Sequence, residues 1–520
     1  MKRRVLNLLP LIVFTAAVFL GSCNKEIVDR TSTYRPLKPS NEDLNADTWK
    51  TVLIANPGVF TVAAPDAIGS AAYTADVSEV KSYQNNLTDD QRAIIAYWSA
   101  GAVLRWNEIL RDLVAKYNLP PYQNPDGTYP FPSSTNPFAY PEFPFSNPPY
   151  AARAYAYVSA AQYDALVTAY HFKKLYNRRP VYQNDASIKP IVPVSGLASY
   201  PSEDAVVAGA TVEMLKFLFP TEVAYIQQKA NEEMQYRIMA GANVRGELTA
   251  GQALGSAVAD VFVARGKTDR AGKAIGSAPE WLSLQTNATS RGDQYWTSLE
   301  TPARPPMLPL FGKVLPFLFD TLTVVALRPG PPNLAGSDAF KAEEAEVLSY
   351  SKNPTREHQA QVEFWADGVG TYTPPGHWNA IAEAEFVQQN YSEVRWARNY
   401  ALLNIAEMDA AICCWDTKYF YFNMRPTQAN PQIKTLTGIP NFPSYTSGHS
   451  NFSAAAAAVL TYLLPDRGTK FTDLAHDAAM SRLYGAIHYR SDCEVGLVTG
   501  AKIGQYAVQW AQSDGAGIGQ

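Results

Sequence analysis

The chain has 520 residues, of which 47% are hydrophobic and 18% are charged, and its formal net charge is −4. This length is sufficient for one large or two medium-sized hydrophobic cores. Because the net charge is slightly negative and no basic face stands out, we expect no nucleic-acid partner.

The N-terminal residues have the pattern of a bacterial lipoprotein signal. A basic start at residues 2–4 precedes a mostly apolar stretch at 5–20, and residues 20–23 read Leu-Gly-Ser-Cys. We predict a signal peptide over residues 1–23 with a lipidated Cys23, in a protein that is exported and lipid-anchored to the bacterial cell envelope. The anchor lies on the periplasmic side or at the outer membrane. A plain signal peptide with an incidental cysteine is the alternative. No later stretch is long and apolar enough to span a bilayer, so the lipid is the only membrane attachment expected.

The first half of the mature chain is predicted to be helical after a polar start. Residues 24–75 are rich in turn-forming residues and are expected to form a flexible tether. Residues 76–335 are assigned to an N-terminal helical bundle with a crossover segment. A capping box at residues 88–91 opens a helix to about residue 117. Apolar spacing predicts further helices at 149–171, 202–218, 221–240 and 247–266.

Two stretches of this half lack helical periodicity. Residues 118–149 are rich in proline and aromatic residues, and we expect them to wrap over the surface or to form a lip over the active site. Residues 267–336 are long and irregular, and we expect them to cross from one bundle to the next.

Helical periodicity resumes at residue 337. Helices are expected at 337–351, 355–366, 376–390, 392–416, 449–464, 470–485 and 492–511. The sequence shows no alternating strand pattern of useful length and no short-period repeat. We therefore predict an all-α protein of two helical bundles, with residues 336–520 as the C-terminal catalytic bundle.

Three cations in this second bundle indicate an anion site. Lys418 and Arg425 are seven residues apart, so on one helix they would share a face about 10 Å apart. Arg482 follows later, and no matching carboxylate cluster accompanies the three. Because arginine offers forked donors and lysine a point charge, this set predicts a site for a tetrahedral oxyanion.

Ser447, Gly448 and His449 stand directly before an alanine-rich helical run. A helix N-terminus presents unpaired N–H groups and a partial positive charge, which suit an anion. Gly448 lets the backbone approach the anion closely, and Ser447 can donate its hydroxyl.

His488 and Asp492 are four residues apart near the start of the last predicted helix. Ser491 and Glu494 have the spacing of a capping box, which would place Asp492 in the first helical turn. From there Asp492 can orient His488 and fix its tautomer. Each of these patterns alone also suits a solvated helix face, an ordinary cap or a structural pair. Their order and spacing together favour one site.

The residues combine as K-x6-R-P, then S-G-H, then S-R-x5-H-x3-D. This combination resembles the superfamily that joins type 2 phosphatidic-acid phosphatases with vanadium-dependent haloperoxidases. Thr446 stands where that family's pattern has a proline. The resemblance implies two four-helix bundles of the vanadium haloperoxidase and acid phosphatase type, the catalytic one C-terminal.

Two blocks are closer to the chloroperoxidase-like branch. The segment from Trp415 to Arg425 is similar to the lysine helix of chloroperoxidases, and Phe442 stands where those enzymes have phenylalanine. Trp365-Ala366-Asp367 is similar to a block whose aspartate pairs with the third-motif arginine, although the spacing here is one residue shorter. His377 is expected either to line the cavity or to have a structural role.

The haloperoxidase interpretation implies vanadate as cofactor, with peroxide and halide as small-molecule substrates. In the family, His488 would bind vanadium and His449 would act as acid and base, with Trp415 and Phe442 forming an apolar wall. The oxyanion oxygens would be held by Lys418, Arg425, Ser447, Gly448 and Arg482.

The phosphatase interpretation uses the same groups on the phosphate of a substrate ester. His488, made more basic by Asp492, would attack phosphorus, and His449 would protonate the leaving alcohol. A third possibility from another class is a non-catalytic oxyanion-binding lipoprotein. A homodimer is the default expectation for the assembly. Cys413, Cys414 and Cys493 are expected to be buried free thiols, with a bridge to Cys493 as the alternative.

Overall fold

The computed structural model describes residues 34–84, 86–119, 147–300 and 303–518. Within these ranges the chain forms helices, and the only β-type pairing is one isolated bridge between Tyr295 and Asn423. The all-α class predicted from the sequence is therefore confirmed. The predicted signal peptide with Cys23, and residues 120–146 of the predicted wrap or lip, lie outside the described residues.

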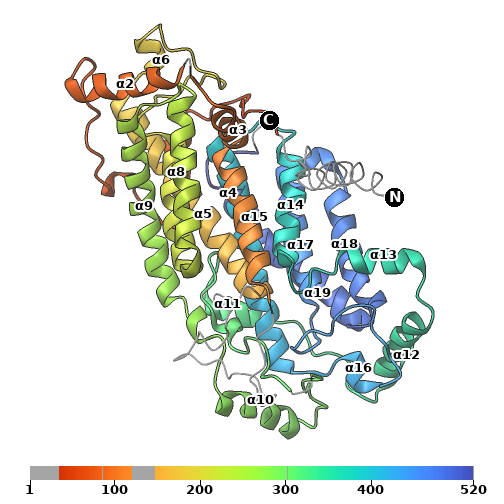
Figure 1. Cartoon of the computed structure of the whole chain (residues 1–520). Coiled ribbons are helices and arrows are strands. Elements are labelled where there is room, and N and C mark those ends of the chain that lie inside the picture. The colour runs from red at the N-terminus through yellow and green to blue at the C-terminus, as the bar shows by residue number, and fades with distance from the viewer. Residues whose placement is uncertain (1–33, 85, 120–146, 301–302, 519–520) are drawn as a thin grey trace, which may run out of the picture. The chain divides into compact units, whose positions relative to one another are not determined.

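Figure 1 labels the helices along the chain. In order they are α2 (Ala71–Gln84), α3 (Asp89–Trp98), α4 (Ala102–Tyr117), α5 (Pro148–Tyr176), α6 (Val181–Asn184), α7 (Glu203–Leu218), α8 (Val223–Met239), α9 (Arg245–Thr268), α10 (Ala278–Ser290), α11 (Thr321–Ala326), α12 (Asp338–Lys352), α13 (Arg356–Phe364), α14 (Thr373–Phe386), α15 (Glu393–Tyr421), α16 (Pro426–Ala429), α17 (Gly448–Leu463), α18 (Lys470–Tyr484) and α19 (Arg490–Gln512). None of the helices in the described ranges has the length and apolar character needed to cross a membrane.

The single helix predicted over residues 88–117 is wrong, because two helices, α3 and α4, occupy that range. They are separated at Gly101, whose φ of +127° is outside the helical region and favours glycine. Glu393 then accepts a hydrogen bond from the backbone N–H of Ala102 at 2.7 Å and begins α4. The break thus depends on a carboxylate 291 residues further along the chain.

Residues 36–75 belong to the same compact unit as the helices, so the predicted flexible tether is wrong for this part. Trp49 and Ile54 are buried. Asp164 of α5 accepts hydrogen bonds from the three consecutive backbone N–H groups of residues 52–54, at 2.7, 2.7 and 3.0 Å. A turn-rich segment is ordered here because a buried carboxylate satisfies its backbone donors.

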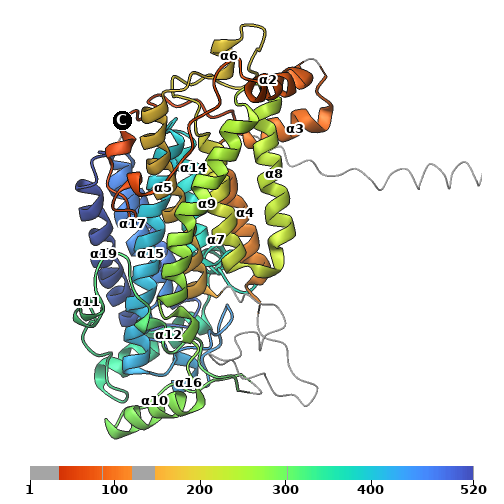
Figure 2. The same ribbon diagram turned by 90° about the vertical axis from the view of Figure 1, so that its left-hand side faces the viewer.

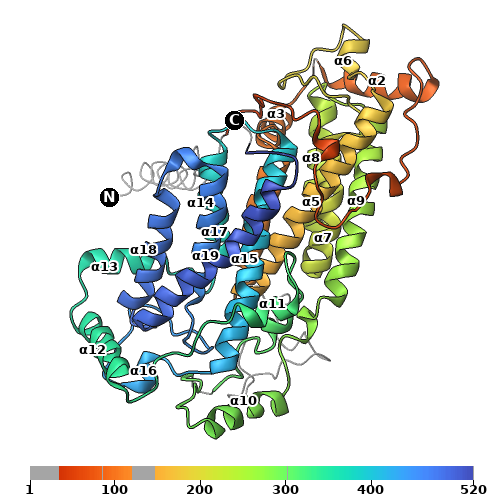
Figure 3. The ribbon, with the colours of Figure 1, turned by 180° about the vertical axis from the view of Figure 1, so that it is seen from behind.

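The core is built around α5 and α15, which are 29 residues long each and pack along one another. Asn147 and Ser392 cap their N-termini through side-chain oxygens, and each helix ends at a residue in the left-handed region. Most positions of both helices are buried, which is expected for helices that are surrounded on all sides. In Figures 1 and 3, α7, α8 and α9 lie on one side of this pair and α17, α18 and α19 on the other.

The two sides repeat one another at a spacing of 245 residues. Helices α5, α7 and α9 begin at 148, 203 and 245, and α15, α17 and α19 begin at 393, 448 and 490. α6 and α16, which follow the long helices, are also 245 apart, and they lie at opposite ends of the helices in all three views (Figures 1–3).

Individual contacts repeat at the same spacing. Arg153 Nε donates to Asp269 at 2.7 Å, and Arg398 Nε donates to Asp514 at 2.6 Å. Asn404 donates to Ser159, its own counterpart, at 3.3 Å, so the two long helices cross at equivalent positions. The repeat supports two bundles of one construction, although the predicted bounds 76–335 and 336–520 stay a prediction.

Candidate active site

Lys418 and Arg425 meet through a chain reversal and not along one helix. α15 ends at Tyr421, Phe422 has a φ of +52°, and Arg425 is the residue before α16. The expectation that the two cations share a helical face is therefore wrong. Both instead reach the backbone of residues 442–444: Lys418 Nζ donates to the carbonyls of residues 443 and 444 at 2.8 Å each.

Arg425 connects this segment to the third motif. Its Nε donates to the carbonyl of Phe442 at 2.9 Å, and its Nη1 donates to the carbonyl of Ile487 at 2.8 Å. The same Nη1 lies 3.5 Å from His488 Nε2. The Phe442 ring centroid is 5.1 Å from Lys418 Nζ and 5.0 Å from the Arg425 guanidinium carbon, which gives the two cations a shared cation–π partner.

Arg482 lies in the last turn of α18. Its Nε donates to Ser481 Oγ at 2.9 Å and its Nη2 donates to the carbonyl of Val362 at 3.2 Å. Like Lys418 and Arg425, it is at most 1% exposed. Its acceptors are thus a hydroxyl and a carbonyl, neither of which carries a full charge.

In the described part of the chain, none of these three cations forms an ion pair with a carboxylate. Burial lowers the pKa of Lys418, and it lowers the pKa of Arg425 and of Arg482 to about 10 each. The arginines stay charged at neutral pH. A buried charge without a counter-charge costs several kcal/mol, in the order of 2–5, so this part of the fold favours a bound anion.

Asp492 orients His488, as predicted from their spacing. Asp492 Oδ2 accepts hydrogen bonds from His488 Nδ1 at 2.9 Å, from the Tyr489 backbone N–H at 3.0 Å and from Ser444 Oγ. Asp492 is the third residue of α19 and itself caps the helix. The predicted capping box of residues 491 and 494 is therefore wrong, while the predicted place of Asp492 in the first turn is confirmed.

These contacts leave His488 Nε2 with an available lone pair. Burial lowers the pKa of His488 well below its usual range, and the nearby charges of Arg425, Lys418 and Arg482 lower it further. The ring is therefore neutral. Because Nδ1–H donates to Asp492, Nε2 is the unprotonated nitrogen, and it is directed toward Arg425.

The N-terminus of α17 lies against the aromatic wall. Ser447 caps the helix, and its Oγ accepts a hydrogen bond from Ser450 N at 3.4 Å, which leaves its hydroxyl hydrogen to donate. A Cβ on Gly448 would lie 3.9 Å from the Trp415 ring, and Trp415 packs on Phe442 with centroids 5.1 Å apart. Both predicted wall aromatics thus border the backbone of the second motif.

His449 contacts Asp367, which is shared with a second histidine. His449 Nε2 lies 3.5 Å from Asp367 Oδ2, and His377 Nδ1 lies 3.0 Å from Asp367 Oδ1. Burial and the charge of Arg482 lower the pKa of His449 to about 4. Burial alone would raise the pKa of Asp367, but its bonds with the two histidines outweigh this and hold it below the usual range. An ionised Asp367 therefore faces a neutral His449.

A family model described as the PAP2 superfamily matches residues 399–515, a range that holds every cation and histidine of the candidate site apart from His377. Over this range the family model agrees with the superfamily expected from the motifs. No curated protein matches the chain by sequence.

A solved structure has a similar fold. The crystal structure of the first bacterial vanadium-dependent iodoperoxidase matches with a TM-score of 0.56 and 22% sequence identity. The match covers 78% of this chain and 96% of that chain. The apo form of a bacterial vanadium-dependent chloroperoxidase has a TM-score of 0.48 and 14% identity, and the match covers 69% of this chain and 92% of that chain. For the holo form the TM-score is 0.48 and the identity 13%, and the match covers 74% of this chain and 97% of that chain. The superfamily match and the shared fold support an enzyme, either a haloperoxidase or a phosphatase.

Two residues of this PAP2-type site were not assigned a role from the sequence. Ser444 donates to Asp492, 48 residues away, and the spacing pattern gave no signal for this contact. His377 was expected only to line the cavity or to have a structural role. The only sequence signal for its hydrogen bond to Asp367 is that the two residues are ten positions apart. Cys413, Cys414 and Cys493 are buried free thiols, as expected.

Proposed function

We propose that this protein is a vanadate-dependent haloperoxidase that oxidises halide with hydrogen peroxide. The observation that carries the proposal is the set of three buried cations that form no ion pair with a carboxylate in the described part of the chain, near a histidine whose Nε2 has only Arg425 Nη1 as a neighbour, at 3.5 Å. A tetrahedral oxyanion supplies the missing negative charge and accepts the N–H groups that now donate only to neutral oxygens.

The residues present suit vanadate. The buried His449 Nε2 has no hydrogen-bond partner among the described residues beyond its 3.5 Å approach to Asp367 Oδ2, so its ring can interact with a ligand at this place. His488 Nε2 would bind the metal, and the oxygens would be held by Lys418, Arg425, Arg482, Ser447 and the Gly448 N–H. When bound, vanadate activates hydrogen peroxide toward attack by a halide.

His449 is suited to move the peroxide proton. A pKa of about 4 leaves its imidazole unprotonated near neutral pH, so it can accept a proton from a peroxide that enters the site. Asp367 would then stabilise the imidazolium, since its ionised carboxylate lies 3.5 Å from Nε2. His377 holds the other oxygen of that carboxylate and so sets its orientation.

The aromatic wall favours the peroxidase over the phosphatase. Trp415 and Phe442 cover the side of the site next to Gly448 with apolar surface. A weakly hydrated halide tolerates such a wall better than the polar leaving group of a phosphate ester does. The shared fold with an iodoperoxidase is consistent with this preference.

A phosphatase is the second candidate, because one observation suits it equally well. His488 is neutral, is oriented by Asp492 and has an available Nε2 among cations, which is also what a nucleophile toward phosphorus needs. His449 would then protonate the leaving alcohol.

One pair of assays separates these candidates. The purified chain without residues 1–23 is incubated with vanadate, peroxide and each halide in turn, and halogenation of a dye is followed. The same sample is tested for hydrolysis of a chromogenic phosphate ester. Vanadate-dependent halogenation supports the proposal, whereas ester hydrolysis without halogenation supports the phosphatase. Oxyanion binding without either activity would support the non-catalytic lipoprotein.

We also propose export and lipid anchoring through Cys23, on the strength of the N-terminal pattern alone. A Cys23→Ser variant should appear in the soluble fraction after expression in a bacterium, while the wild-type chain stays with the membranes. Equal partition of the two proteins would refute the anchor.

A further inference from the structure

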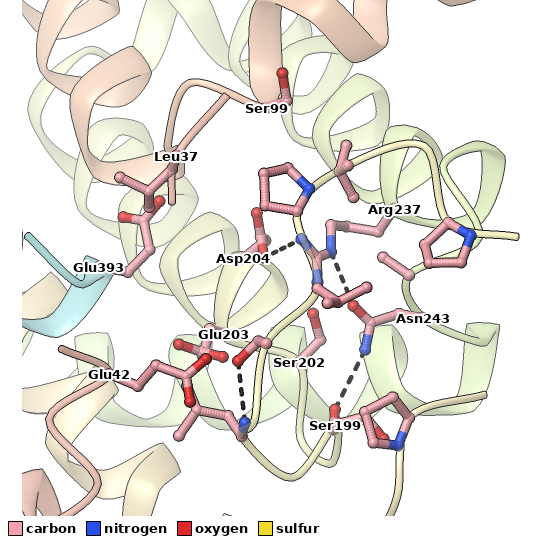
Figure 4. A pocket seen from close by; sticks show the side chains of 18 of the residues that line it. Leu37, Glu42, Ser99, Ser199, Ser202, Glu203, Asp204, Arg237, Asn243 and Glu393 are labelled. Carbon is pink, nitrogen blue, oxygen red and sulfur yellow. Dashed lines mark hydrogen bonds and ion pairs between the residues drawn. The ribbon is translucent and has the colours of Figure 1, made fainter. Parts of the chain in front are cut away.

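A cavity of about 110 Å³ lies where the repeat places the counterpart of the candidate active site (Figure 4). Its walls come from the start of α7, the end of α8, the start of α15 and the loops between residues 180 and 202. α6 is next to it and α16 is next to the active site, and these two short helices lie at opposite ends of the molecule's helices (Figures 1–3). The two places are therefore distinct.

The framework of the active site recurs in this cavity, 245 residues earlier. Lys173 Nζ donates to the carbonyl of Ala198 at 2.6 Å, as Lys418 does to that of Pro443 at 2.8 Å. Arg237 stands where the C-terminal bundle has Arg482.

The hydrogen bonds around the catalytic pair recur as well. Asn243 Nδ2 donates to Glu247 Oε2 at 2.7 Å, and Ser199 Oγ donates to Glu247 Oε1. The counterparts of these contacts are those of His488 and Ser444 with Asp492. The cavity is thus a second copy of the same construction.

Four replacements change the chemistry of the copy. By the 245-residue spacing, Asn243 replaces the histidine at 488 and Asp204 replaces the one at 449. Pro180 replaces the arginine at 425, and Glu203 replaces the glycine at 448. The copy has lost its nucleophilic ring nitrogen and one cation, and it has gained two carboxylates.

These replacements invert the charge balance. Lys173 Nζ lies 3.3 Å from Glu203, and Arg237 Nη1 lies 3.3 Å from Asp204, so both retained cations are neutralised in place. Glu42 and Glu393 also line the cavity, and neither has an ion-pair partner in the described part of the chain. Burial raises the pKa of Glu393 to about 8, which keeps it protonated at neutral pH. Three carboxylates, Glu42, Glu203 and Asp204, therefore face two cations, where the active site has three cations without an ion-paired carboxylate.

Several oxygen atoms in the cavity can accept further hydrogen bonds. Ser202 is 1% exposed, and its Oγ has no hydrogen-bond partner among the described residues. Glu42 Oε1 accepts the Gly196 N–H at 2.7 Å, and Glu203 Oε2 faces Lys173, so each carboxylate has a second oxygen to offer. Figure 4 shows Glu42, Glu203 and Ser202 around this part of the cavity. The lining also includes apolar side chains, among them Val192, Val194, Leu197 and Pro190.

We propose that this second pocket binds a small primary alkylammonium ion. The ammonium group has three N–H donors, which match the acceptors of Glu42, Glu203 and Ser202, and its charge offsets the excess of carboxylates. A short alkyl chain suits the valine and proline wall. The volume is somewhat below the ~150 Å³ of an engineered apolar cavity that binds benzene, so the ligand has only a few carbon atoms.

The two obvious competitors fit less well. An oxyanion would meet Glu203 and Asp204 at the positions where the active site has glycine and histidine. A metal ion needs at least three converging ligands, and no such group of His, Cys, Asp or Glu occurs among the described residues. The proposal does not depend on the function proposed for the other site.

The test is isothermal titration of the purified chain, without residues 1–23, with n-propylammonium chloride. Tetramethylammonium chloride serves as the control, because it has the same charge but no N–H donor. We expect saturable 1:1 binding of propylammonium only. Glu203→Gln should weaken it at least tenfold and Ser202→Ala severalfold, while Arg482→Ala in the other bundle should leave it unchanged.

A cooperative thermal unfolding transition, followed by circular dichroism, is the control that each variant is folded. The proposal is overturned if propylammonium gives no saturable heat, if tetramethylammonium binds equally well, or if folded Glu203→Gln binds propylammonium like the wild type. It is also overturned if orthovanadate binds with a second equivalent that is lost in Arg237→Ala, since that would make this pocket a second oxyanion site.

Discussion

Other buried arginines of this fold show what is unusual about the three site cations. Arg398 and Arg153 are also buried, and each donates to a buried aspartate at 2.6–2.7 Å. Arg425 and Arg482 are buried to the same degree and have only carbonyl, hydroxyl or imidazole contacts. The fold can therefore supply carboxylate partners at such positions, and their absence here marks a place for an external anion.

Arg482→Ala should weaken oxyanion binding by about 2–5 kcal/mol, because it removes a buried charge that the proposed anion would pair with. Titration with orthovanadate measures the change. Arg237→Ala is the matched control, since Arg237 has the same place in the other bundle, and it should leave vanadate affinity unchanged. Equal weakening by both substitutions would mean that the effect is one of general stability.

His377→Ala should lower halogenation turnover with little change in vanadate affinity. Its loss frees one oxygen of Asp367, so the carboxylate no longer keeps its orientation toward His449. His377→Asn, which keeps a donor in a similar place, should restore part of the turnover. If the alanine variant has wild-type turnover over the whole pH range, His377 does not position Asp367 for the reaction.

At the scale of elements, the site depends on how closely α17 and α19 approach. Gly500 of α19 lies against the backbone of Asn451 in α17, and a Cβ at Gly500 would come within 2.3 Å of that carbonyl oxygen. This contact keeps the α17 N-terminus, with Ser447, next to the first turn of α19, with Asp492. The backbone bond from Ser447 N to the Asp492 carbonyl, at 2.9 Å, depends on it.

Gly500→Ala should reduce the free energy of unfolding by about 1–3 kcal/mol or more, because a backbone oxygen cannot move aside. Urea denaturation followed by circular dichroism measures this. Gly438→Ala is the control: no atom lies within 4 Å of the added methyl group, so stability should change little. An equally stable Gly500→Ala protein would show that the two helices can separate without cost.

Apolar spacing and capping residues were sufficient to predict most long helices, since their signals are local. The motif spacing likewise predicted that Lys418, Arg425, Arg482 and His488 lie together, and Arg425 Nη1 is 3.5 Å from His488 Nε2. The breaks and contacts that were missed have distant causes. Glu393 begins α4, and Asp164 orders residues 52–54, each from more than 100 residues away. No local pattern contains such partners.

At the scale of the whole molecule, the repeat joins two bundles whose equivalent sites have opposite charge. Its trace in the sequence is slight: Ser199-Tyr200-Pro201-Ser202 and Ser444-Tyr445-Thr446-Ser447 stand 245 residues apart. The repeat is hard to recognise from the sequence because its period is long and the two copies have few identical residues, although their side-chain contacts are equivalent. The shared contacts include the Arg–Asp pairs and the close helix crossings at Gly255 and Gly500.

Buried carboxylates of this framework predict a pH dependence of stability. Burial raises the pKa of Asp409 from 3.8 to about 7, although it accepts two backbone N–H bonds. Between these values the folded state keeps a proton that the unfolded state loses. The contribution is therefore fully present below the unfolded pKa near 4, and it is lost as the pH rises through 7.

For wild type, this group should lower the free energy of unfolding by as much as about 1.4 kcal/mol per pH unit between pH 4 and 7. Asp409→Asn removes this pH dependence. The difference in the free energy of unfolding between wild type and Asp409→Asn should therefore change steadily between pH 4 and 7. Urea denaturation at several pH values measures it. A constant difference would mean that Asp409 has the same pKa in both states.

The central claim is that Lys418, Arg425, Arg482 and His488 hold one tetrahedral oxyanion per chain. Isothermal titration of the purified chain with orthovanadate tests it most directly. We predict one equivalent bound in the wild type and in Arg237→Ala, and none in the variant that combines Lys418→Met, Arg425→Met and Arg482→Met. Stoichiometric binding that survives in the folded triple variant would contradict the account, as would a wild-type chain that binds no vanadate.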